Sequence, residues 1–85
     1  MNRKKLLKRL SQGVLQNVAF GAMQNLVEGF GFRFARAKGS HRIFVHPEIP
    51  ELINLQEVKG EAKPYQIRQF LRLVERYNLK MEDDA

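Results

Sequence analysis

A glycine, a serine and a histidine follow one another at positions 39–41, within the stretch AKGSHRIFVHP. A neutral imidazole can take the proton of a ribose 2′-hydroxyl, and nearby cations can stabilise the charge that develops on the attacked phosphate. Gly39 would allow close approach of the backbone, Ser40 adds a hydroxyl, and His41 is the candidate acid or base. Cleavage of RNA by this chemistry requires no metal ion.

Three cations flank the triplet, namely Arg36, Lys38 and Arg42, and we expect them to surround His41 and to hold phosphate groups. A structural interpretation is also available. Gly-Ser-His at a hairpin is most often a turn glycine, a polar turn residue and a partly exposed strand histidine, with the cations as a solvated rim. The triplet alone therefore does not decide between a catalytic and a structural histidine.

The second histidine, His46, lies five residues after His41 and directly before Pro47. Because side chains alternate along a strand, the two imidazoles should point to opposite faces, and no nearby acid pair completes a metal site. The glycines of GFGF, residues 29–32, lack the downstream helix and lysine of a phosphate-binding loop. We expect a structural or surface role for His46, no metal and no small-molecule cofactor.

The composition points to a polyanionic partner. The chain has 85 residues, no cysteine and a formal net charge of +6. Residues 1–42 carry nine Lys or Arg and one acid, a net charge of +8, whereas residues 43–85 carry six against eight, a net of −2. We therefore expect the basic N-terminal half to converge on the Gly-Ser-His stretch and to bind nucleic acid. No apolar run is long enough for a membrane span, and we expect a cytoplasmic protein that binds no membrane.

Hydrophobic periodicity predicts one α+β domain, a two-layer sandwich in which helices cover one face of a three-stranded antiparallel sheet. Of the six phenylalanines, Phe44 is the candidate for the open face of this sheet, and most of the six are needed for the core. The expected elements are an N-terminal helix at 2–12, a helix around 23–30, strands at 32–38, 41–46 and 52–58, a loop at 59–63, a helix at 64–78 and a polar tail at 80–85. In the first strand, alternation places Phe32 and Phe34 on one face and Arg33 and Ala35 on the other.

Four segments resemble, in order, the signature of the HicA toxins of bacterial and archaeal type II toxin–antitoxin systems: LVEGFGF, RFARAK, GSHRIF and HP. Two further segments, INLQ and KGEAKPYQIRQFLRLVERYNL, are similar to the third strand and last helix of one branch of that family. The likeness covers residues 20–79, and the helix at 2–12 lies outside it.

The resemblance implies a fold like that of a double-stranded-RNA-binding domain, ribosome-independent cleavage of mRNA, and neutralisation by a HicB antitoxin that masks the site. By position, His41 matches the catalytic histidine of the family and Gly39 the motif glycine, with Ser40 between them. The chain departs from the commonest family form, which has a short glycine-bounded segment before the last helix.

Three functions therefore compete at this point. The first is a metal-independent endoribonuclease that uses His41. The second is a non-catalytic RNA-binding module that uses the same basic surface. The third is a protein-interaction domain whose positive surface docks an acidic partner, for which RNA affinity should be negligible even at low salt.

Overall fold

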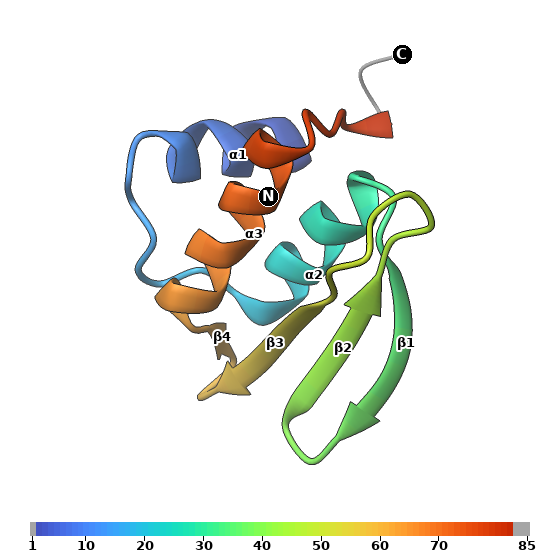
Figure 1. The fold of residues 1–85 in the computed structure, drawn as a ribbon. Coiled ribbons are helices and arrows are strands. Elements are labelled where there is room, and N and C mark those ends of the chain that lie inside the picture. Colours follow the sequence, from blue (N-terminus) through green and yellow to red (C-terminus); the bar gives the residue numbers. More distant parts are fainter. Residues whose placement is uncertain (1, 83–85) are drawn as a thin grey trace.

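The structure is a computed structural model, and it describes residues 2–82. Figure 1 shows the three helices gathered on one side of an antiparallel sheet, which confirms the predicted α+β class. In chain order the elements are α1 (Arg3–Ser11), α2 (Phe20–Gly29), β1 (Arg33–Lys38), β2 (His41–Val45), β3 (Ile53–Val58), β4 (Glu61–Ala62) and α3 (Pro64–Arg76).

The sheet has four strands in the order β1-β2-β3-β4, so the prediction of three strands is wrong by one. The missed strand, β4, lies in the segment expected to be a loop. It forms because Lys59 and Gly60 both have positive φ values, 53° and 79°, as a two-residue type I′ hairpin turn requires. The chain before α2 then pairs with its outer edge, where the amide of Ala62 donates to the Val18 carbonyl at 2.9 Å.

The core fills the space between the helices and the sheet. Phe44 of β2 is fully buried, so the expectation that it lies on the open face is wrong. Its neighbours from β3 are Ile53 and Leu55, also buried. The helices contribute most of the remaining core, including Leu6, Leu10, Met23, Leu26, Val27, Ile67 and Phe70. One face of the sheet is therefore covered with apolar side chains.

The N-terminal helix α1 is an integral part of this packing. The Asn2 side chain accepts a hydrogen bond from the Lys5 amide at 2.8 Å and thereby caps the helix. Arg3 donates to the carbonyl and the side chain of Asn25 in α2, both at 2.9 Å, and Arg9 donates to the Gln16 carbonyl. Both arginines thus hold α1 in place.

The expected convergence of the N-terminal charge on the Gly-Ser-His stretch is not observed. In Figure 1, α1 (blue) and the turn between β1 and β2 (green) lie at opposite ends of the molecule. The excess positive charge of residues 1–42 is therefore spread over two separate surfaces, one on α1 and one on the sheet. This separation arises because α1 packs on α2 rather than on the sheet.

Helix α3 ends at Arg76, two residues earlier than predicted, and the segment after it is not a purely polar tail. Met81 is only 4% exposed and belongs to the core cluster, which corrects the expectation for residues 80–82. The rest of the expected tail, residues 83–85, lies outside the described residues.

The C-terminal end of α3 is tied to the segment before β3 by a phenol and a carboxylate. The hydroxyl of Tyr77 donates to both carboxylate oxygens of Glu51, at 2.6 and 2.7 Å, and Arg76 lies 3.6 Å from the same carboxylate. The hydrogen bond to Glu51, with desolvation as a smaller cause, raises the pKa of Tyr77 above its ordinary value of 10.0. The nearby Arg76 acts in the opposite direction.

A raised pKa means that the fold stabilises the neutral phenol. This stability is fully present below the unfolded-state pKa and is lost as the pH rises through the folded-state pKa. Because the chain has two tyrosines, Tyr65→Phe leaves a protein whose ultraviolet titration reports Tyr77 alone. We expect a midpoint above 10.0 that Glu51→Gln lowers. A midpoint that Glu51→Gln leaves unchanged would contradict the assigned cause.

Candidate active site

Strand β2 presents His41 on the face of the sheet that the helices leave uncovered. Alternation along a strand sends Arg42 and Phe44 to one face and His41, Ile43 and Val45 to the other. Since Phe44 is fully buried beneath the helices and Val45 is 40% exposed, the His41 face is the open one. The imidazole of His41 is itself half-buried among its neighbours on that face.

A β-bulge in β1 brings two cations to the same face. Phe34 pairs with Phe44, but the next pair is Arg36 with Ile43, so β1 contains one additional residue, Ala35. Beyond the bulge, Lys38 pairs with His41. Strict alternation would have turned Arg36 and Lys38 to the helix side with Phe34; the bulge turns them to the open face.

These side chains surround a shallow hollow of about 510 Å³ on the open face. Four of the predicted site residues line it, namely Arg36, Lys38, Gly39 and His41, together with Ile43 and Asn54. The hollow is electropositive because both of its formally charged side chains are cations. A phosphate group beside His41 would meet two positive charges and no carboxylate among these lining residues.

Sequence reasoning missed Asn54. Its side-chain oxygen lies 3.0 Å from Nδ1 of His41, across the β2–β3 pairing. Asn54 pairs with Ile43, so it is the diagonal neighbour of His41 on the same face. The sequence does show a polar residue, Asn54, in the alternating pattern of the strand predicted at 52–58. Only the register between β2 and β3 shows which residue of β2 this side chain contacts.

The structure does not bring Arg42 into this site, so the expectation that it surrounds His41 is corrected. The Arg42 guanidinium lies over the ring of Phe20 in α2, with its central carbon 5.8 Å from the ring centroid. That position is on the helix face, as alternation from His41 requires. Ser40 also does not line the hollow, and its carbonyl accepts a hydrogen bond from the Glu57 amide at 3.2 Å.

Gly39 is required by the backbone of the turn. It is the first residue of the two-residue loop between Lys38 and His41 and has a φ of +60°, as a type II′ hairpin turn requires. A Cβ added at Gly39 would meet no atom within 4 Å. The space beside this glycine is therefore open among the described residues.

We expect Gly39→Ala to lower the free energy of unfolding by about 1 kcal/mol, because an L side chain is strained at this φ. Gly21→Ala is the matched control: Gly21 lies in α2, and a Cβ there also meets nothing within 4 Å. That change should stabilise the protein by about 0.5–1 kcal/mol. Denaturant unfolding of both variants measures the difference, and equal effects would exclude the turn as the cause.

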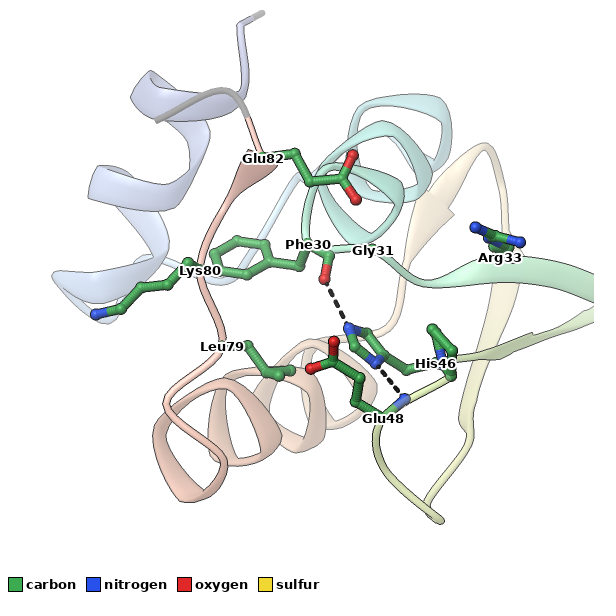
Figure 2. A pocket seen from close by; sticks show the side chains of 9 residues that line it. Phe30, Gly31, Arg33, His46, Glu48, Leu79, Lys80 and Glu82 are labelled. Carbon is green, nitrogen blue, oxygen red and sulfur yellow. Dashed lines mark hydrogen bonds between the residues drawn. The ribbon is translucent and has the colours of Figure 1, made fainter. Parts of the chain in front are cut away.

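The second histidine occupies a different hollow, of about 300 Å³, shown in Figure 2. His46 Nε2 lies 3.1 Å from the Phe30 carbonyl oxygen, which can only accept, and the Glu48 amide donates to Nδ1 at 3.1 Å. Both ring nitrogens of His46 are therefore engaged by the backbone. The structural role expected for His46 agrees with this geometry, and its imidazole has no nitrogen left for proton transfer.

Residues 2–82 offer neither a cluster of metal ligands nor a helix that could span a membrane. No group of three His, Cys, Asp or Glu side chains in this range is placed to hold a metal ion. None of its helices combines the length and the apolar character that crossing a membrane demands.

The fold and the site together define a small, basic α+β domain with a histidine beside two cations in a hollow on the open face of its sheet. Comparison with protein families gives a match to the family described as HicA toxin of bacterial toxin–antitoxin systems, over residues 23–75. Because the match spans more than half of the chain, the protein belongs to the HicA toxin family. Comparisons with curated proteins and with solved structures give no match. The family model begins after α1 and contains all four strands and nearly all of α3.

Proposed function

We propose that this protein is the toxin of a type II toxin–antitoxin pair and acts as a metal-independent endoribonuclease on mRNA in the cytoplasm. His41 takes the proton of a ribose 2′-hydroxyl, whose oxygen attacks the adjacent phosphate. The bond from phosphorus to the 5′-oxygen breaks, and this oxygen takes up a proton from water, which leaves a 2′,3′-cyclic phosphate and a 5′-hydroxyl. Arg36 and Lys38 hold the phosphate and stabilise its developing charge, while Gly39 and Ser40 form the turn that sets their spacing.

One observation carries this proposal: the bulge at Ala35 places two cations beside a half-buried histidine on an uncovered sheet face. A surface hollow of this kind suits an extended strand of RNA, which needs only access to one phosphate and its neighbouring hydroxyl. Membership of the HicA family supports the same function.

A HicB-type antitoxin is the proposed protein partner. The open face carries exposed apolar side chains beside its cations, with Val45 at 40% and Val58 at 41% exposure. Exposed apolar residues next to a charged rim are typical of protein-binding surfaces. An antitoxin segment that brings acidic and apolar residues to this face would exclude RNA from His41.

The test is incubation of the purified protein with a single-stranded RNA oligonucleotide in excess EDTA. We expect products with 2′,3′-cyclic phosphate ends, at the rate seen without the chelator. Tight RNA binding without such products would indicate the non-catalytic RNA-binding module instead. Negligible RNA affinity at low salt would indicate a protein-interaction domain.

A further inference from the structure

We propose that Asn54 is the positioning residue of His41: it fixes the imidazole in the tautomer whose Nε2 is free to accept a proton. The proposal rests on the endoribonuclease function proposed above and assigns within it the reacting nitrogen and the residue that selects it. Nothing in the Gly-Ser-His motif identifies either of them. The assignment arises from the register of β3 against β2.

A hydrogen bond joins the side chains of His41 and Asn54. Nδ1 of His41 and Oδ1 of Asn54 are 3.0 Å apart, and an amide oxygen can only accept. The proton of a neutral imidazole must then be on Nδ1, which leaves the lone pair on Nε2. A general base needs such a lone pair, so this contact selects the reactive form of the ring.

The contact with Asn54 also sets the direction in which the His41 ring points. Nδ1 is turned toward β3, and the hollow also contains Lys38 and Arg36 from β1 on the other side of β2. With Nδ1 held by Asn54, Nε2 is the nitrogen available to a ribose hydroxyl whose phosphate is bound by these cations. Holding the ring in one orientation also removes rotational freedom that would otherwise be lost during the reaction.

His46 provides an internal contrast. Its Nε2 faces the Phe30 carbonyl and its Nδ1 accepts from the Glu48 amide, so its proton must be on Nε2. The two histidines of this chain are therefore expected in opposite tautomers. A single spectrum that resolves both rings can test this pattern.

The experiment is a long-range ¹H–¹⁵N correlation spectrum of the full-length protein, recorded at a pH where both rings are neutral and assigned with His41→Gln and His46→Gln. We expect His41 to show the Nδ1–H pattern and His46 the Nε2–H pattern. In Asn54→Ala, His41 should change to a mixture of tautomers while His46 stays as it was. An Nε2–H pattern for wild-type His41 would overturn the proposal, because Asn54 would then be donating through its nitrogen.

Cleavage kinetics supply the second readout. Asn54→Ala should lower the cleavage rate by about tenfold to a hundredfold, whereas Gln56→Ala removes an amide from the position opposite His41 and should leave the rate unchanged. Asn54→Asp places a carboxylate beside the His41 ring, which otherwise faces the cations Arg36 and Lys38. The carboxylate favours the imidazolium form, so the acid limb of the pH–rate profile should move to higher pH.

The outcomes separate this inference from the proposed function. If the wild type fails to cleave RNA, the endoribonuclease function falls, whichever tautomer the spectrum shows. If the wild type cleaves RNA and Asn54→Ala retains the full rate, only the role of Asn54 falls. An acid limb that stays in place in Asn54→Asp would likewise show that the residue does not act through His41.

Discussion

Replacing His41 with alanine should reduce RNA cleavage by about 10²–10⁴-fold, the range typical of removing one acid–base catalyst. The fold should survive, because the His41 side chain is only half-buried and lies on the open face of the sheet, opposite the core that contains Phe44. The measurement is the initial rate of oligonucleotide cleavage under conditions that saturate the enzyme with RNA. Circular dichroism of the same samples reports whether the variant is folded.

The control is His46→Gln, which replaces the other histidine of the chain, in the hollow shown in Figure 2. It leaves the open face untouched, so we expect cleavage to continue at the wild-type rate in the folded fraction. The lost contacts with the Phe30 carbonyl and the Glu48 amide should appear as lower thermal stability. If folded His41→Ala cleaved RNA at the full wild-type rate, His41 would have no role in the mechanism.

The second large effect is expected from the cations, and it separates the two faces of the sheet. Lys38→Ala should weaken RNA binding and reduce the slope of log affinity against log salt by about 0.7, the value for one phosphate contact with a single strand. Arg36→Ala should behave in the same way, since both cations line the hollow at His41. Fluorescence titrations over a range of salt concentrations give these slopes.

Arg42→Ala is the control for the loss of one positive charge at a neighbouring position. Its guanidinium lies over the Phe20 ring on the opposite face, so the salt slope should remain that of the wild type. The lost cation–π contact should instead cost about 0.5–1 kcal/mol of stability. Equal loss of RNA affinity in Lys38→Ala and Arg42→Ala would show that net charge, not the open face, determines binding.

Local signals in the sequence were sufficient for the helices and for the hairpin of β1 and β2. The apolar spacing that predicts α3 and the turn glycine Gly39 before His41 are both patterns of residues that are close together in the sequence. The same locality allowed His41 and His46 to be placed on opposite faces by counting alternate positions. Fold class, turn and candidate histidine could therefore be predicted.

Features that depend on contacts between distant segments of the chain could not be predicted from such local patterns. The strand β4 is held partly by the chain around Val18, and the contact of Asn54 with His41 depends on strand register. The bulge at Ala35 interrupts alternation without glycine or proline to mark it, so the face of Arg36 could not be derived by counting. The position of α1 likewise depends on packing with α2.

If the open face of the sheet cleaves RNA through the ribose 2′-hydroxyl, an RNA strand and its 2′-deoxy counterpart must behave differently. The same oligonucleotide sequence is supplied as RNA and as a version in which every 2′-hydroxyl is replaced by hydrogen, both in excess EDTA. We predict rapid cleavage of the RNA to 2′,3′-cyclic phosphate ends and no cleavage of the deoxy version. Cleavage of both strands at similar rates, or of neither, would show that the protein does not cleave RNA through the 2′-hydroxyl.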